Sequence, residues 1–207
     1  MKNKIIHALG EDKLEHEENI IYSQIHVIDL RRRTKNRQGI KICDEKPEGT
    51  DTLLIENPNM LNISATVFKP QCFIDKDGKE LPNCEGVFYL TNSTDKTWVL
   101  FFEIKDSKAS RCSNYIKKTK EQIITVVKIF RDKNIITQNK IVYANISFPR
   151  RTKTDYSMKL NFKENPKQFI DKYKIHFLGT NTLLIKSDTE IDNLSSTKIA
   201  DENHVIF

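Results

Sequence analysis

Two acidic residues and one lysine stand at the ends of hydrophobic segments, where their side chains could take part in chemistry. Glu103 and Lys105 close the most hydrophobic run of the chain, residues 98–105, which we predict to be a buried central strand. Because alternate side chains of a strand share one face, Glu103 and Lys105 project together. Burying two charged groups costs free energy unless they are paired or bind something. The pair is therefore either a structural ion pair at a strand end or part of a binding site.

Glu85 precedes a second hydrophobic segment, residues 86–90, which we also predict to be a strand. A polar turn at residues 92–96 separates this segment from the strand that ends at Glu103. If the two strands form an antiparallel hairpin, the start of the first lies beside the end of the second, and Glu85 lies next to Glu103. Two carboxylates and the ammonium of Lys105 at one sheet edge form a site for a divalent metal ion, with an additional cation beside it.

This arrangement resembles the PD-(D/E)xK nuclease superfamily. The pattern of that family is an acidic residue that opens one strand, an acid-x-Lys at the end of the next strand, and then a helix packed on the sheet. The residues that carry the resemblance are Cys84–Tyr89 and Phe101–Asp106, and it extends over residues 60–148. The acid-x-Lys tripeptide occurs elsewhere in the chain, but only the copy that starts at Glu103 ends an apolar strand and precedes an amphipathic helix.

The resemblance implies a restriction-endonuclease-like fold and a catalytic set of Glu85, Glu103 and Lys105. Glu85 and Glu103 would hold Mg²⁺ or Mn²⁺, an ion that prefers hard oxygen ligands and that polarises the phosphorus–oxygen bond and activates water. Lys105 would orient that water and offset the charge that develops on the phosphate.

The first acid departs from the family pattern, which usually has Asp directly after Pro, whereas Glu85 follows Cys84. Other acids are therefore alternative metal ligands. Asp75 or Asp77 could take the first position if the preceding hairpin folds toward the site, although residues 75–78 read as a turn. A glutamate from the first predicted helix could also join the site, as in some relatives. The candidates there are Glu17 and Glu18.

Basic residues give the chain a formal net charge of +6, from 34 Lys and Arg against 28 Asp and Glu. A positive excess is compatible with a polyanionic partner, and three clusters could follow a phosphate backbone without reading sequence. The candidate nucleic-acid contacts are Arg31, Arg32, Arg33, Lys117, Lys120, Gln122, Arg150 and Arg151. The resembled family often places a Lys or Gln of the helix near the metal, and here Lys120 and Gln122 both remain candidates. A solvated basic surface is the competing interpretation.

Hydrophobic periodicity predicts an α/β fold, with a mixed central sheet flanked by helices. The expected helices cover residues 14–30, 113–130 and a short segment beginning near 166; the expected strands cover residues 62–69, 71–75, 86–90, 98–105, 141–148, 175–178 and 182–185. Residues 1–186 are expected to form a single nuclease-like domain, and residues 187–207 a polar, acidic tail. The four cysteines have no zinc-ligand spacing, so they are interpreted as buried, apolar side chains.

Composition and motifs exclude several classes of function. The chain has no apolar stretch near the roughly 20 residues that span a bilayer, and we expect a cytoplasmic protein without a membrane partner. It has no phosphate-loop motif, dinucleotide-binding glycine pattern or nucleophile elbow. The resemblance therefore points to a Mg²⁺-dependent phosphodiesterase that cleaves DNA, as a subunit of a defence or DNA-processing system. The alternatives are a non-catalytic module on the same fold that binds nucleic acid or a protein, and a nuclease that acts on RNA. Besides nucleic acid, the candidate partners are another protein and a second copy of the chain.

Overall fold

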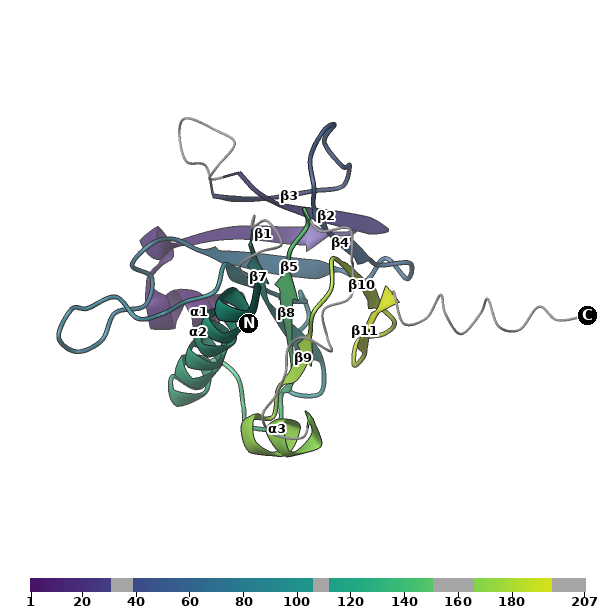
Figure 1. Cartoon of the computed structure of the whole chain (residues 1–207). Helices are drawn as coiled ribbons and strands as arrows, with labels where there is room; N and C mark the ends of the chain where they lie inside the picture. The colour runs from purple at the N-terminus through teal and green to yellow at the C-terminus, as the bar shows by residue number, and fades with distance from the viewer. Residues whose placement is uncertain (31–38, 106–111, 151–165, 195–207) are drawn as a thin grey trace, which may run out of the picture.

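The computed structural model describes residues 1–30, 39–105, 112–150 and 166–194 (Figure 1). Its elements, in chain order, are α1 (Lys2–Leu9), the short 3-10 helix η1 (Glu11–Lys13), β1 (Leu14–Ile20), β2 (Gln24–Asp29), β3 (Ile40–Cys43), β4 (Leu53–Glu56), β5 (Ile63–Phe68), β6 (Gly86–Leu90), β7 (Trp98–Ile104), α2 (Cys112–Asp132), β8 (Ile141–Ser147), α3 (Pro166–Tyr173), β9 (His176–Leu178), β10 (Thr182–Ile185) and β11 (Ile191–Asn193). The fold is of the α/β class, as the sequence predicts, and it contains two sheets.

The central sheet has six strands in the order β1-β5-β6-β7-β8-β9. Strands β5, β6 and β7 form an antiparallel meander, and β8 and β9 then run parallel to β7. Helix α2 makes the crossover between β7 and β8, as a parallel connection requires. Every residue of β7 is buried, which explains why its sequence is apolar at all positions but Glu103 and does not alternate between polar and apolar residues.

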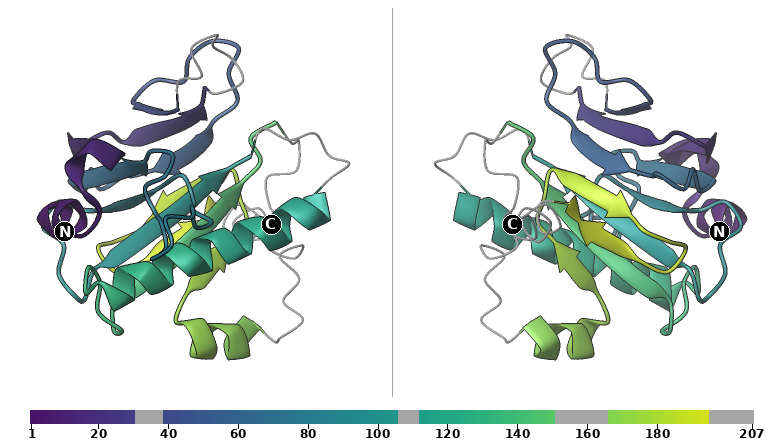
Figure 2. Two further views of the ribbon diagram at one scale, coloured as in Figure 1. Left: turned by 90° about the vertical axis from the view of Figure 1, so that its left-hand side faces the viewer. Right: turned by 90° about the vertical axis from the view of Figure 1, so that its right-hand side faces the viewer.

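The two faces of the central sheet are covered differently (Figure 2). On one face, Val99 and Phe101 of β7 pack with Phe130 of α2 and with α1. On the other face, Leu100 and Phe102 pack against a second sheet, whose strand order is β11-β10-β4-β2-β3. Helices α1 and α2 therefore cover one face of the central sheet, and the second sheet covers the other. A second sheet takes the place of helices on one face because β2, β4 and β10 each present buried, branched apolar side chains to it.

The helix expected over residues 14–30 is also wrong, because this segment forms β1 and β2, which belong to different sheets. Leu14 of β1 packs on the α2 side of the central sheet, whereas Ile20 packs on the other side. A bulge between Glu17 and Ile20, where Asn19 has φ of 57°, changes the face. The apolar residues of segment 14–30 have a helix-like spacing because a bulge in β1 and the turn between β1 and β2 interrupt the alternation of the strands.

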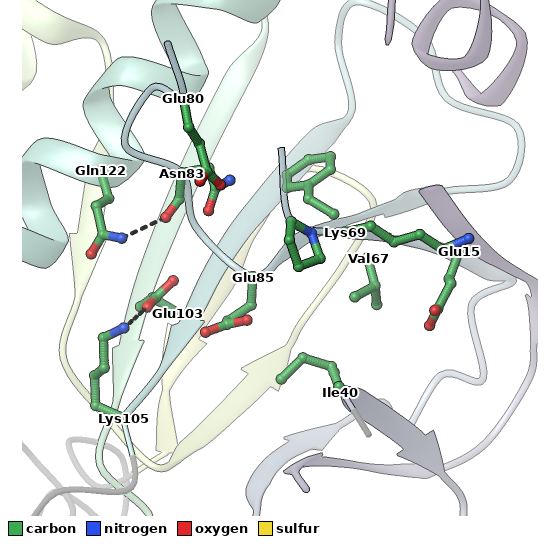
Figure 3. Close-up of a pocket in the computed structure, with 13 residues that line it drawn as sticks. Glu15, Ile40, Val67, Lys69, Glu80, Asn83, Glu85, Glu103, Lys105 and Gln122 are labelled. Carbon is green, nitrogen blue, oxygen red and sulfur yellow. Dashed lines mark hydrogen bonds and ion pairs between the residues drawn. The ribbon is translucent and has the colours of Figure 1, made fainter. Parts of the chain in front are cut away.

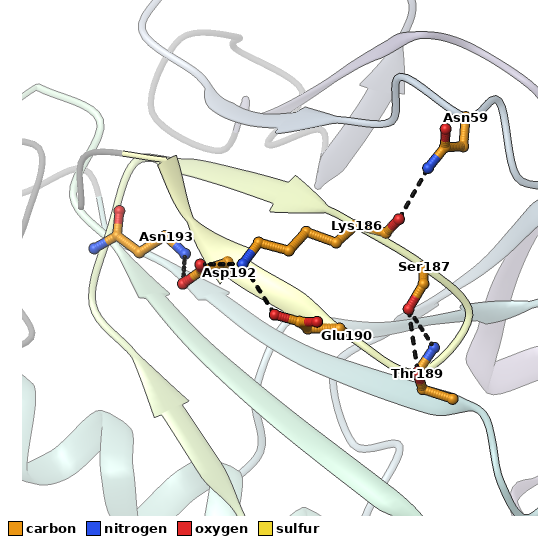
Figure 4. Close-up of polar contacts among 7 residues, drawn as sticks. All are labelled: Asn59, Lys186, Ser187, Thr189, Glu190, Asp192 and Asn193. Atoms are coloured by element: carbon orange, nitrogen blue, oxygen red, sulfur yellow. Dashed lines mark hydrogen bonds and ion pairs between the residues drawn. The ribbon is translucent and has the colours of Figure 1, made fainter. Parts of the chain in front are cut away.

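The structure also differs from the expected strand at residues 71–75 and from the expected tail at residues 187–207. The strand expected over residues 71–75 is reduced to one isolated bridge between Ile74 and Glu80. The tail expected from residue 187 begins instead with a turn and strand β11, which pairs with β10. Lys186 bridges Glu190 and Asp192 across this hairpin, at 2.9 and 2.7 Å (Figure 4). The indole of Trp98 donates to the carbonyl oxygen of Ser187 at 2.9 Å, which ties the hairpin to the central sheet.

The helices are amphipathic and lie against the sheets. The predicted helix over residues 113–130 is confirmed as α2, and α3 begins at Pro166, as predicted. Within the described ranges of the chain, no helix combines the length and the apolar character that crossing a membrane requires.

Candidate active site

The β6–β7 hairpin brings Glu85 beside Glu103. Gly86 pairs with Phe102 in the antiparallel register, and the N–H of Glu85 donates to the carbonyl oxygen of Phe102 at 3.2 Å. The next position along this register places Glu85 opposite Glu103, and both side chains project from the face that α2 covers. The two acids that the sequence singles out are thus neighbours on adjacent strands.

Lys105 completes the group from the end of β7. Its ammonium forms an ion pair with the Oε1 atom of Glu103 (Figure 3). The side chain of Glu103 is only 1% exposed and that of Lys105 is 26% exposed, so the carboxylate lies inside and the ammonium reaches solvent. The backbone N–H of Lys105 donates to the carbonyl oxygen of Ser147 at 2.9 Å, so β8 fixes the point from which the lysine extends.

These three residues line a cavity of about 480 Å³ at the end of the sheet where β5 and β7 end and β6 begins. Figure 3 shows the carboxylate of Glu85 directed toward the Glu103–Lys105 pair. The Nε2 atom of Gln122 on α2 donates to the carbonyl oxygen of Asn83 at 2.6 Å, which anchors this side chain beside the cavity. The Gln122 Oε1 atom is buried and has no hydrogen-bond partner among the described residues.

The pKa of the Cys84 thiol is affected by the negative charge of this site. Burial, and then the negative charges of Glu103 and Glu85, raise the pKa of the Cys84 thiol well above its ordinary value. Cys84 and Cys72 are free and buried, as expected, whereas Cys43 is free but only half-buried, and the side chain of Cys112 lies outside the described residues. Cys84 is therefore a neutral thiol, and it donates to the carbonyl oxygen of Gly86 at 3.7 Å.

The residues of the cavity fit a hard divalent cation. Glu85 and Glu103 supply carboxylate oxygens from adjacent strands, and the Gln122 amide oxygen lines the same cavity. Carboxylate and amide oxygens are the ligands that Mg²⁺ takes in proteins, and the ion usually keeps several waters as well. In the described residues, no group of three or more His, Cys, Asp and Glu side chains gathers as a metal cage. Glu85, Glu103 and Gln122 would therefore supply only part of the shell of such an ion, and waters would have to complete it.

The other candidate metal ligands lie elsewhere. The carboxylate of Asp75 accepts hydrogen bonds from the backbone N–H groups of Asp77 and Lys79, both at 2.9 Å, within a turn. Glu18 pairs with Lys2 at 3.1 Å. Glu17 on β1 lies opposite Ala65 on β5, and burial raises the pKa of the Glu17 carboxyl group. The acid from the segment 14–30 that does line the cavity is Glu15.

The candidate nucleic-acid contacts are dispersed. Gln122 lines the cavity, whereas the Lys120 ammonium lies 4.8 Å from the ring centroid of Phe169. Lys117 and Arg150 are exposed. Arg31, Arg32, Arg33 and Arg151 lie outside the described residues.

Several cavity residues were not anticipated from the sequence, among them Lys69, Glu80 and Asn83. They come from the connection between β5 and β6, which carries no motif and no regular periodicity. Comparisons with family models, with curated proteins and with solved structures found no match, so the site is interpreted from its own geometry.

Proposed function

We propose that this protein is a Mg²⁺- or Mn²⁺-dependent endonuclease with a restriction-endonuclease-like fold and DNA as its substrate. The observation that carries the proposal is the convergence of Glu85, Glu103 and Lys105 in one cavity. The arrangement of the strands supports it, because the meander of β5, β6 and β7 is followed by a helix packed on the same sheet. This is the order of acid, acid-x-Lys and helix that the family resemblance implies.

The roles of the residues follow from their charge and position. Glu85 and Glu103 would hold the ion, and a bound ion would polarise the phosphorus–oxygen bond and lower the pKa of the attacking water. The ammonium of Lys105, held by Glu103 and partly open to solvent, lies where it can orient that water and stabilise negative charge on the phosphate. Neutralising charge matters here because the cavity is also lined by the carboxylates of Glu15 and Glu80.

Cleavage of circular DNA tests the proposal. The wild-type chain is expected to nick circular duplex and circular single-stranded DNA in Mg²⁺ or Mn²⁺, and to lose this activity in EDTA. Glu103→Gln and Lys105→Met nearly preserve side-chain volume while removing the charge, and each is expected to reduce the cleavage rate by about 100-fold or more. The matched controls are Glu190→Gln and Lys186→Met, which remove the same charges from an exposed ion pair.

The competing function is a binding module in which Glu103 and Lys105 form only a structural pair. It is supported if no metal-dependent cleavage of any DNA or RNA circle occurs, while Glu103→Gln and Lys105→Met lower the melting temperature. Breaking a buried ion pair costs about 3–5 kcal/mol. If only RNA circles are cleaved, the proposed catalytic site is supported, but its substrate is RNA and not DNA.

A further inference from the structure

Strand β8 continues past the end of its neighbour β9. The last register pair of these two strands is Asn145 with Leu178, whereas β8 extends to Ser147 and pairs there with Ile104 of β7. The peptide group that joins Ser147 to Phe148 therefore lies next to β7 on one side and beyond the end of β9 on the other. Ser147 and Phe148 are fully buried, and a buried N–H without a hydrogen-bond partner is costly. Another group must therefore take the place of a strand at this point.

The side chain of Asn181 supplies that group. Asn181 stands directly before β10 and is only 6% exposed. Its Oδ1 atom accepts a hydrogen bond from the N–H of Phe148 at 2.8 Å, and its Nδ2 atom donates to the carbonyl oxygen of Phe148 at 2.9 Å. A carboxamide offers the same kinds of donor and acceptor as a peptide group, so it can replace a residue of a neighbouring strand.

The backbone around Asn181 is itself fixed by hydrogen bonds. The Nδ2 atom of Asn145 donates to the carbonyl oxygen of Thr180 at 3.0 Å, and the N–H of Thr180 donates to the Oδ1 atom of Asn145 at 3.2 Å. The carbonyl oxygen of Asn181 accepts from the N–H of Leu54 on β4 at 2.9 Å. Residues 180 and 181 are thus tied both to β8 and to the second sheet, which sets the position of the Asn181 side chain.

The peptide group that Asn181 holds is also the one that anchors Lys105. The carbonyl oxygen of Ser147 accepts the hydrogen bond from the N–H of Lys105, and the N–H of Phe148 belongs to the same peptide group. Because a peptide group is planar, the hydrogen bond to Asn181 on one side fixes the direction of the carbonyl group on the other. Consecutive hydrogen bonds of this kind also polarise and strengthen one another.

We propose that Asn181 is a positioning residue for Lys105, acting through the peptide group between Ser147 and Phe148. It fixes the backbone from which the Lys105 ammonium extends to Glu103 in the cavity. The consequence for catalysis rests on the proposed nuclease function. A lysine that orients water and stabilises charge on a phosphate must be held closely, since a displacement of about 1 Å can slow a reaction by about 100-fold.

Single-turnover cleavage of circular DNA in Mn²⁺, measured well below the melting temperature of every variant, tests the proposal. Asn181→Ala is expected to reduce the maximal rate by about tenfold or more. The half-saturating DNA concentration should stay unchanged, because the lost interaction acts on the transition state. In the Lys105→Met background, Asn181→Ala should have no further effect, because the lysine through which it acts is absent. Ser147→Ala removes only the other hydrogen bond to the Asn181 Oδ1 atom, at 2.8 Å, and should cleave almost as fast as the wild type.

Asn57→Ala is the matched control for the loss of a buried asparagine. Asn57 is fully buried; its amide donates to the carbonyl oxygens of Tyr22 and Leu61 and accepts from the N–H of Leu61, all at 3.0 Å. It precedes β5, whose first residues lie at the end of the sheet away from Glu85. Asn57→Ala should lower the melting temperature, as Asn181→Ala does, but should leave the cleavage rate unchanged. A merely structural role of Asn181 predicts an unchanged rate for both variants.

Amide hydrogen exchange gives a readout that does not depend on cleavage. The N–H groups of Lys105 and Phe148 are expected to exchange about fivefold faster or more in Asn181→Ala than in Asn57→Ala, which is the factor expected for the loss of one hydrogen bond. The comparison with Asn57→Ala separates this local effect from a general loss of stability.

The outcomes distinguish this inference from the nuclease proposal. If Asn181→Ala cleaves as fast as the wild type, or slows Lys105→Met by the factor by which it slows the wild type, the inference is overturned and the nuclease proposal stands. If the wild type cleaves no DNA or RNA circle, the nuclease proposal fails, and hydrogen exchange decides whether Asn181 positions Lys105. Faster exchange of the Lys105 N–H then supports the positioning, and equal exchange in Asn181→Ala and Asn57→Ala overturns it.

Discussion

The N–H of Glu85 donates a hydrogen bond to the carbonyl oxygen of Phe102, which places Glu85 directly beside Glu103 on the neighbouring strand. We expect these two carboxylates to bind one divalent ion together. A ligand that binds only the folded state stabilises it by RT ln(1 + [L]/Kd), which is about 2.7 kcal/mol when the ion is present at 100 times its Kd. Mn²⁺ should therefore raise the melting temperature of the wild-type chain, and Glu85→Gln should abolish the increase.

The control for metal binding is Glu190→Gln, which removes a carboxylate from the exposed β10–β11 hairpin. This variant should respond to Mn²⁺ as the wild type does. An equal increase in Glu85→Gln and in the wild type would mean that the ion binds elsewhere.

Gly86 is expected to be intolerant of substitution. A Cβ atom there would lie 2.5 Å from the carbonyl oxygen of Thr66 and 2.9 Å from the ring of Phe102, both of which belong to packed strands. Gly86→Ala should therefore lower the free energy of unfolding by about 1–3 kcal/mol, measured by urea denaturation. Gly39→Ala is the control, because no atom lies within 4 Å of its added Cβ, and it should change stability by less than about 1 kcal/mol. Similar values for the two variants would contradict the close packing at Gly86.

Residues 187–194 are expected to be part of the folded domain. Their removal deletes the buried side chains of Ile191 and Asn193, which are 3% and 5% exposed, and the carbonyl oxygen of Ser187 that accepts the hydrogen bond from Trp98. A chain ending at residue 186 should be less stable than a chain ending at residue 194 by about 3 kcal/mol or more, since burial of one Ile contributes about 1.5–3 kcal/mol and each hydrogen bond about 1 kcal/mol. Thermal denaturation of the two truncated chains measures the difference. Equal melting temperatures of the two chains would mean that residues 187–194 do not stabilise the domain and belong to a tail.

Three histidines are expected to make the fold sensitive to mild acid. Burial lowers the pKa of His16, His26 and His176 below the ordinary value of 6.5. The unfolded chain therefore binds more protons than the folded chain below pH 6.5, and stability should fall as the pH decreases from 6.5 toward 5. Urea denaturation at several pH values measures this slope. His16→Gln, which can keep a hydrogen bond to Thr66, should make the slope smaller, and an unchanged slope would exclude His16 as a contributor.

The part of the fold that the sequence predicts well is the part with local and continuous signals. The run 98–104 is apolar at every position except Glu103, because both faces of β7 are buried. The apolar period of α2 extends over enough residues to identify a helix. The juxtaposition of Glu85 and Glu103 followed from strand alternation and from the short turn between β6 and β7. These are the signals that depend only on neighbours in the chain.

The remaining features depend on contacts between distant segments. The bulge at Asn19 and the second sheet decide that residues 14–30 form strands, and neither is visible in a local pattern. Strand β11 has only three residues, and it is held by pairing with β10. Lys69 and Glu80 enter the cavity because the 71–80 hairpin folds back on itself, which spacing alone does not predict.

The rate of Mn²⁺-dependent cleavage of circular DNA by Glu103→Gln, compared with the wild type at matched melting temperatures, tests the central claim most directly. We expect the wild type to cleave and Glu103→Gln to be slower by a factor of about 100 or more, because an uncharged amide binds a divalent ion more weakly than a carboxylate does and no longer pairs with Lys105. Equal rates in the two proteins, or no cleavage by a folded wild-type chain in either Mg²⁺ or Mn²⁺, would contradict the assignment of Glu85, Glu103 and Lys105 as a catalytic site.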